Sequence, residues 1–171
     1  MQLRKLSHGL ALTFAIGACA STDAAAAQER WATYTNPRFG TTADYPADIF
    51  SVRDRPPENG DGQRFRSGDG RAQLSIYGQY NVEADTPKSY LEKFVDQQGI
   101  SYRRVTKRFY VVSGSRDGDI FYQRCNFPAN LDGIIDCLNV SYPAQEKTTW
   151  DPIVTRLSQS LHAGRGIEPR P

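Results

Sequence analysis

Alternating apolar and polar positions along much of the chain predict β-strands. Within residues 71–80, the small or apolar Ala72, Leu74, Ile76 and Gly78 alternate with polar or amphipathic residues. Because successive side chains of a strand point to opposite faces, this segment predicts a strand with one buried face and one solvated face. Shorter strand-like segments with turn residues nearby cover residues 31–37, 41–45, 49–52, 63–65, 101–106 and 109–114.

The segment 119–143 predicts a β-hairpin with a cysteine on each strand, which we call the cysteine hairpin. With Leu131 at the tip, Cys125 and Cys137 each lie six residues away and face each other. Gly133 can adopt the positive φ that such a turn requires. Opposed Cβ atoms on antiparallel strands are about 4.5–5.5 Å apart, and a disulfide needs about 3.5–4.5 Å. The sequence therefore predicts a Cys125–Cys137 disulfide, with two buried free thiols as the alternative.

Two segments have apolar residues at helical spacing. The first begins with Thr86 as the N-cap and Pro87 at the first helical position, and Gly99 ends it. The second can be capped by Thr148 or Thr149. Strands joined by short turns, together with two helices, indicate an α+β domain, an antiparallel β-sheet packed by two α-helices with the cysteine hairpin at its centre. The positions expected in the core are Tyr90, Leu91, Phe94 and Val95 in the first helix, and Trp150, Ile153, Val154, Leu157 and Leu161 in the second.

The N-terminal pattern is typical of a secretory signal. Two positive residues at positions 4 and 5 precede an apolar stretch at 10–16 and a run of small residues that ends at Ala27. The apolar stretch is too short for a membrane-spanning helix. We expect residues 1–27 to be a signal peptide and the mature protein to be periplasmic or secreted. The alternative is a lipoprotein signal, in which Cys19 would carry a lipid anchor to the outer membrane.

The remaining length and charge correspond to one domain of ordinary composition. We expect a single α+β domain at residues 28–163. Residues 164–171 have no apolar periodicity and contain two prolines, which predicts a disordered tail. The formal charge of the whole chain is +2, and such a near-neutral balance argues against a nucleic-acid partner. No second apolar stretch is long enough to cross a bilayer.

Short motifs near both ends of the chain carry a resemblance to a known family. They are Tyr34 with Asn36, Phe39-Gly40, Tyr45-Pro46 followed by Phe50, then Tyr142-Pro143, Trp150 and Ser160-Leu161. This pattern resembles the PsbP-like fold family, the lumenal extrinsic photosystem proteins with many exported bacterial relatives, and is similar to small exported proteins of α-proteobacteria. The resemblance implies an α/β/α sandwich that binds, docks or assembles and has no shared catalytic residues. The cysteine hairpin and the PENGDG segment at 57–62 are not part of the plant pattern, so no partner contact is carried over.

The residues suited to catalysis or metal binding are few. His8 lies in the expected signal peptide and His162 lies near the expected tail. The expected mature chain therefore has too few histidines for a multi-histidine metal site, and a histidine triad is not expected. A disulfide would remove both Cys125 and Cys137 as nucleophiles. The chain has no Gly-x-Ser-x-Gly, Walker A or His-Glu-x-x-His motif. We therefore expect no catalytic residue, no metal and no cofactor.

The longest polar loop, RDRPPENGDG at residues 53–62, is the candidate binding site. Together with Arg38 from another turn, Asn59 and Asp61 offer a guanidinium, an amide and a carboxylate suited to orienting a polar group of a partner. The alternative is that residues 59–62 only turn the chain. Glu58 and Asp61 also suggest a calcium loop, or the carboxylate pair of a hydrolase.

The densest positive charge is a basic group in a predicted strand and the turn after it, made up of Arg103, Arg104, Lys107 and Arg108. Such charges solubilise an edge strand, or alternatively form a docking patch for an anionic lipid, a glycan or an acidic partner. The sequence therefore predicts a non-catalytic exported binding, docking or assembly module, acting on an unknown envelope protein or a small polar ligand. The alternative is a cell-envelope hydrolase that uses a carboxylate pair.

Overall fold

The computed structural model describes residues 30–167, which form two antiparallel β-sheets and two α-helices. The expected signal peptide, including Cys19, lies outside the described residues. None of the helices within 30–167 has the length and apolar character needed to span a bilayer. In chain order the elements are β1 Trp31–Thr35, β2 Thr41–Pro46, β3 Val52–Arg53, β4 Gly62–Arg66, β5 Gln73–Tyr80, α1 Pro87–Phe94, β6 Ile100–Val105, β7 Phe109–Arg116, β8 Asp119–Asn126, β9 Ile134–Pro143, the 3₁₀ helix η1 Ala144–Glu146, α2 Lys147–Ser160 and β10 His162–Ala163.

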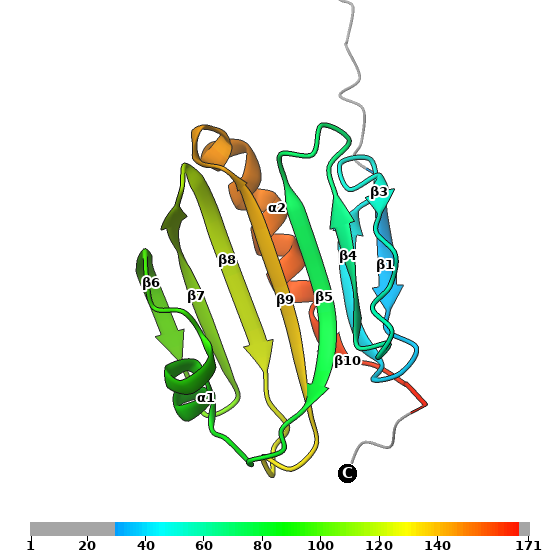
Figure 1. Cartoon of the computed structure of the whole chain (residues 1–171), viewed down its shortest axis with the longest axis vertical. Helices are drawn as coiled ribbons and strands as arrows, with labels where there is room; N and C mark the ends of the chain where they lie inside the picture. Colours follow the sequence, from blue (N-terminus) through cyan, green and yellow to red (C-terminus); the bar gives the residue numbers. More distant parts are fainter. Residues whose placement is uncertain (1–29, 168–171) are drawn as a thin grey trace, which may run out of the picture.

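The large sheet has seven strands in the order β3-β4-β5-β9-β8-β7-β6, and Figure 1 shows it with β6 at the left. The small sheet has the order β1-β2-β10. The structure confirms the predicted α+β class and the central position of the cysteine hairpin, whose strands are β8 and β9. A second sheet differs from the expectation of one sheet. Strands β1 and β2 pair with each other apart from the large sheet, and β10, from the other end of the sequence, pairs with β2.

The cysteine hairpin has the predicted register. Cys125 is paired with Cys137 in the β8–β9 ladder, and the two are joined by a disulfide. Leu131, with a φ of 61°, lies at the tip as expected, and Gly133 has a φ of 133°. Both half-cystines are fully buried. The bridge therefore joins the middle strand of the large sheet, β9, to its neighbour β8.

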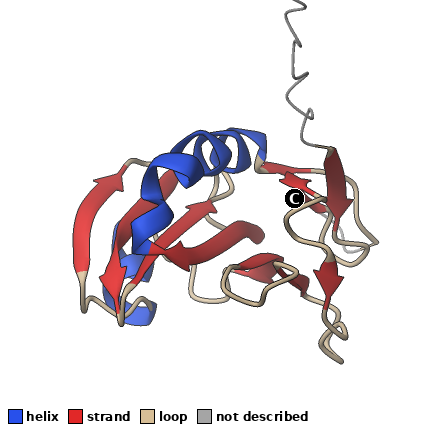
Figure 2. Cartoon of the chain, turned by 90° about the horizontal axis from the view of Figure 1, so that it is seen from above, coloured by secondary structure: helices blue, strands red, loops and turns tan. Residues whose placement is uncertain are grey.

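One face of the large sheet is covered by α2 and by the small sheet (Figure 2). The Trp150 indole of α2 stacks on the ring of Tyr142 from β9, with ring centroids 4.9 Å apart. From the small sheet, the Tyr45 ring stacks on Phe65 of β4 at 4.5 Å. Aromatic pairs of this kind stabilise a fold by about 0.5–1.5 kcal/mol beyond the area that they bury. These contacts form a continuous core between the two sheets and α2.

The opposite face of the large sheet is partly covered by α1. Thr86 caps this helix as predicted, since its Oγ1 accepts a hydrogen bond from the backbone N–H of Ser89 at 3.1 Å. Leu91 is buried against the half-cystines and their neighbours. The expectation that Phe94 is a core residue is wrong, because its side chain is 56% exposed. The helix ends at Phe94, and so short a helix buries only a narrow stripe around Leu91.

Two expectations about the C-terminal part are also corrected. The helix α2 begins at Lys147, directly after η1, so neither Thr148 nor Thr149 is its N-cap. The expected disorder from Gly164 onward does not hold for residues 164–167. The N–H of Gly164 donates to the carbonyl of Gly40 at 2.7 Å, and the N–H of Ile167 donates to the carbonyl of Pro37 at 3.1 Å. Small residues permit this approach, since a Cβ at Gly166 would lie 2.4 Å from the carbonyl oxygen of Arg38. Residues 168–171 lie outside the described part.

Candidate functional site

The structure brings the three predicted binding residues together, and we call Arg38, Asn59 and Asp61 the loop cluster. Arg38 comes from the turn between β1 and β2, whereas Asn59 and Asp61 belong to the loop between β3 and β4. The Arg38 guanidinium donates to the backbone carbonyl of Asn59 at 2.7 Å. The Asn59 side-chain amide donates to the Asp61 carboxylate at 2.8 Å. Hydrogen bonds thus link the three residues across two loops, through the backbone of Asn59 on one side and its side chain on the other.

Aromatic rings support the Arg38 end of the loop cluster. The guanidinium carbon lies 4.5 Å from the centroid of the Phe39 ring and 5.8 Å from that of Tyr80. Arg38 is half-buried, so these cation–π contacts contribute about 0.5–1 kcal/mol or more. They help to fix the position of the guanidinium.

The buried Asn36 ties the same two loops together from beneath. Its side-chain amide donates to the carbonyl of Gly60 at 2.9 Å, and its Oδ1 accepts from the N–H of Phe39 at 2.6 Å. The amide also donates to the hydroxyl of Tyr34 at 3.3 Å. Burial raises the pKa of that phenol. Asn36 is 1% exposed. That its side chain positions the loop cluster was not predicted from the sequence. Its position in the turn before Pro37 was the one available signal.

The end of the loop is fixed by direct contact with β5. The carbonyl of Asp61 accepts a hydrogen bond from the N–H of Gly78 at 2.8 Å. A Cβ at Gly62 would lie 2.4 Å from the Cβ of Tyr77, so only glycine permits this backbone approach. Residues 59–62 therefore turn the chain and also form part of the loop cluster.

The carboxylates proposed for a hydrolase do not share a hollow. Asp61 lines a hollow of about 450 Å³ beside β4 and β5, and Glu58 is not among its lining residues. The other carboxylate there, Asp54, is paired with Arg66 at 2.8 Å. Glu58 is exposed on the outside of the loop. No group of three or more potential metal-ligating side chains occurs within residues 30–167.

The basic group lies where the sequence predicts, on and beside an edge strand. Arg103 and Arg104 are on β6, the last strand of the large sheet, and Lys107 and Arg108 are in the turn that follows. All four side chains are exposed. The Arg104 guanidinium lies 5.4 Å from the centroid of the Phe109 ring.

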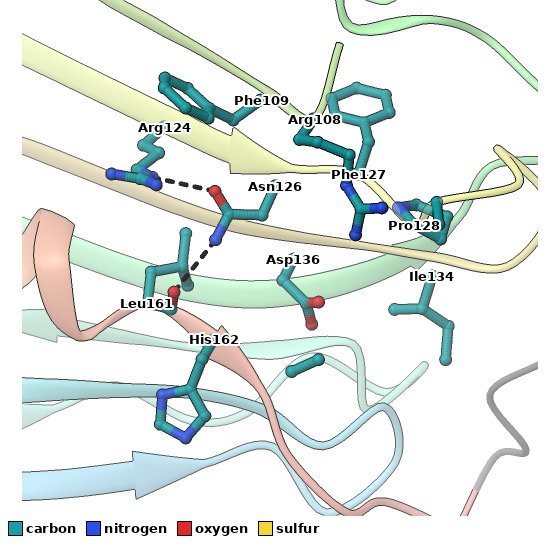
Figure 3. Close-up of a pocket in the computed structure, with 12 residues that line it drawn as sticks. Arg108, Phe109, Arg124, Asn126, Phe127, Pro128, Ile134, Asp136, Leu161 and His162 are labelled. Carbon is teal, nitrogen blue, oxygen red and sulfur yellow. Dashed lines mark hydrogen bonds between the residues drawn. The ribbon is translucent and has the colours of Figure 1, made fainter. Parts of the chain in front are cut away.

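A pocket that the sequence did not predict as a site lies on the α2 side of the large sheet (Figure 3). Its volume is about 550 Å³, within the usual range for small-molecule sites. The charged or titratable side chains that line it are Arg108, Arg124, Asp136 and His162. They come from the β6–β7 turn, β8, β9 and β10, so only the folded sheet brings them together.

Comparison with known proteins identifies the fold. No protein-family model matches the chain, and no curated protein matches it in sequence. Among solved structures, it is similar to the solution structure of cyanobacterial PsbP (CyanoP) from Synechocystis sp. PCC 6803. The TM-score is 0.57 at 12% sequence identity, and the match covers 86% of this chain and 98% of that one. The chain has a PsbP-like fold. The PsbP-like fold confirms the structural part of the resemblance, and at this identity it shows the fold alone.

Proposed function

We propose that this chain is a non-catalytic exported module that docks a partner, an envelope protein or a small polar ligand, through the loop cluster. The observation that carries the proposal is the convergence of Arg38, Asn59 and Asp61 from two separate loops into one hydrogen-bonded surface group. The PsbP-like fold is consistent with a docking or assembly role.

The loop cluster has the chemistry and the rigidity for such a role. A guanidinium, an amide and a carboxylate together donate and accept hydrogen bonds, so they select for polar groups in a defined orientation. Asn36 and the contact of Asp61 with Gly78 hold both loops on the sheets. A surface that is already ordered loses less conformational entropy when it binds, which raises affinity for a given contact area.

The proposed export rests on the N-terminal sequence pattern, and it has its own test. Intact-mass measurement of the exported protein should give a chain that begins at Gln28. A chain that begins at a diacylated Cys19 would instead place the module on a lipid anchor, and a chain retaining residues 1–27 would contradict export.

The docking proposal is tested with the triple variant Arg38→Ala, Asn59→Ala, Asp61→Ala in capture from the cell envelope. The matched control is Asp69→Ala with Arg71→Ala. This control removes another exposed network, in which Asp69 and Arg71 are 2.8 Å apart, and leaves the loop cluster intact. We expect the triple variant to lose the partners that wild type and control both retain. Melting temperatures of all three proteins are compared in parallel.

The size of the structural effect separates docking from a purely structural role. The hydrogen bonds that the triple variant loses are exposed, and each such bond contributes about 0.5–1.5 kcal/mol. We therefore expect a loss of a few kcal/mol at most, which leaves the protein folded. Capture that is unchanged in the triple variant contradicts the proposal. Equal loss of partners in the control variant contradicts it as well, because the effect would then not belong to the loop cluster.

A further inference from the structure

The pocket of Figure 3 exists because α2 stops short of the end of the large sheet. The helix ends at Ser160, and Leu161 leads directly into β10, which turns away to pair with β2. The part of β8 and β9 around Asn126 and Asp136 is therefore left without a helix above it. The pocket shares no lining residue with the loop cluster, and it is a separate site on the molecule.

One arginine of the pocket is held in a fixed orientation. The Nε of Arg124 donates to Asn126 Oδ1 at 2.9 Å, and Nη1 donates to Ser158 Oγ at 3.1 Å. Its guanidinium carbon also lies 4.6 Å from the centroid of the Phe109 ring. A guanidinium has five N–H donors, so donors remain for a ligand after these two bonds.

The second arginine points toward the middle of the pocket. Figure 3 shows the Arg108 side chain extending from its turn toward the space above β9. Within residues 30–167, the Arg108 guanidinium makes no hydrogen bond or ion pair. A guanidinium matches the planar geometry of a carboxylate and binds it through two parallel hydrogen bonds.

Asp136 and His162 complete the charged or titratable lining of the pocket. Asp136 is 4% exposed and accepts a hydrogen bond from Thr41 Oγ1 at 2.5 Å, and it contributes one negative charge to the wall. With two arginines and one aspartate, the lining carries more positive than negative charge, which favours an anionic ligand over a neutral one. His162 is exposed, and its Nδ1 lies 2.7 Å from the carbonyl of Ser160, which orients the ring beside the opening.

The remaining wall is apolar. It is formed by Phe109, Phe127, Ile134 and Leu161, of which the last three are buried. An apolar wall next to a few convergent polar groups is the usual composition of a small-molecule site.

We propose that this pocket binds a small organic monocarboxylate, with its carboxylate on Arg108 and its apolar body on the wall formed by Phe127 and Ile134. Benzoate serves as the probe, benzamide as its uncharged counterpart of the same shape, and inorganic phosphate as the anion without an apolar body. Each is titrated into the purified protein and followed by the NMR shifts of the backbone amides of Asn126, Asp136 and Ala163. We expect benzoate to bind in about the millimolar range and both other probes to bind more weakly.

The decisive variant is Arg108→Gln, with Lys107→Gln as its matched control. Lys107 is the neighbouring exposed residue of the same turn and does not line the pocket. Arg108→Gln should weaken benzoate binding about tenfold, the effect of losing a charged hydrogen bond, and Lys107→Gln should change it by less than about twofold. Because Arg108 is exposed, the amide spectrum away from the pocket should stay unchanged in both variants.

Three results would overturn the proposal. Benzoate that shifts none of the pocket amides at tens of millimolar concentration would show that the pocket does not bind monocarboxylates. Equal binding of benzamide or of phosphate would remove the assignment of a monocarboxylate. Equal weakening by the two glutamine variants would trace the effect to the general charge of the turn instead of to the pocket. None of these results bears on the loop cluster, which is tested separately.

Discussion

Removal of the Cys125–Cys137 disulfide should destabilise the domain strongly without changing its fold. The bridge joins residues separated by 12 positions, and in the chain-entropy view a loop of this length restricts the unfolded chain by about 3 kcal/mol at 25 °C. The hydroxyl of Tyr110 donates to Cys125 Sγ at 3.1 Å, and loss of that bond adds about 1 kcal/mol. The double variant Cys125→Ala, Cys137→Ala should therefore lose about 4 kcal/mol of unfolding free energy.

This loss is a large share of the stability of an ordinary domain, which is about 5–15 kcal/mol. The fold should persist, because β8 and β9 remain hydrogen-bonded to each other and to β7 and β5. For a domain of this size we expect a fall in the melting temperature of about 10 °C or more.

Urea denaturation of three samples measures the effect: oxidised wild type, wild type with a reductant, and the alanine variant. The reduced wild type should lose about 3 kcal/mol relative to the oxidised protein, because it keeps both side chains and lacks only the bridge. A difference below about 1 kcal/mol between oxidised and reduced wild type would refute the claim that the bridge stabilises the domain by restricting the unfolded chain. Rapid thiol labelling of native oxidised protein at Cys125 and Cys137 would show that the bridge is absent.

Two further predictions follow from close contacts and burial around β5. In thermal denaturation, Gly62→Ala should lower the unfolding free energy by more than about 2 kcal/mol, because the new Cβ would meet Tyr77. Gly60 has open space around it and a φ of 66°, so Gly60→Ala should lower it by about 1–2 kcal/mol. Equal losses in the two variants would contradict the contact. Burial raises the pKa of Tyr77 to about 12, so its stabilising contribution is complete below the unfolded pKa of about 10 and is lost as pH rises from about 10 to 12. Measured by urea denaturation between about pH 9 and 11, the unfolding free energy of wild type should fall by about 1 kcal/mol more than that of Tyr77→Phe. Identical falls in both proteins would refute this.

Local patterns were sufficient to predict the central elements of the fold. The cysteine hairpin is symmetric about Leu131 in sequence, so its register and its disulfide follow from strand geometry alone. Thr86 as the N-cap and Pro87 at the first helical position mark the start of α1 by residue type alone. In both cases the interacting residues are close in the sequence.

Features that depend on distant contacts could not be predicted in the same way. The pairing of His162 with Thr42 brings β10 to β2, and no local pattern in a two-residue strand signals it. The exposure of Phe94 depends on where α1 ends relative to the sheet. The ordering of residues 164–167 depends on a turn more than a hundred residues earlier.

The candidate sites show the same division. The loop cluster could be predicted because two of its members share one loop and Arg38 lies in a turn with matching chemistry. Asn36, which supports it, is a single buried side chain, and its position before Pro37 did not indicate that it would hold two loops together. The pocket of Figure 3 is built from distant segments, and of its charged or titratable residues only Arg108 and His162 stood out in the sequence.

The most direct test of docking through the loop cluster is site-specific crosslinking in the intact cell envelope. A photo-crosslinking amino acid in place of Glu58, which is exposed beside Asn59, reports contacts of the loop, and the same group in place of the exposed Gln159 on α2 serves as the control. Docking through the loop cluster predicts a discrete crosslinked species from position 58 that is absent from position 159 and is lost with the three alanine substitutions of the loop cluster. No species from position 58, or the same species from both positions, would contradict it.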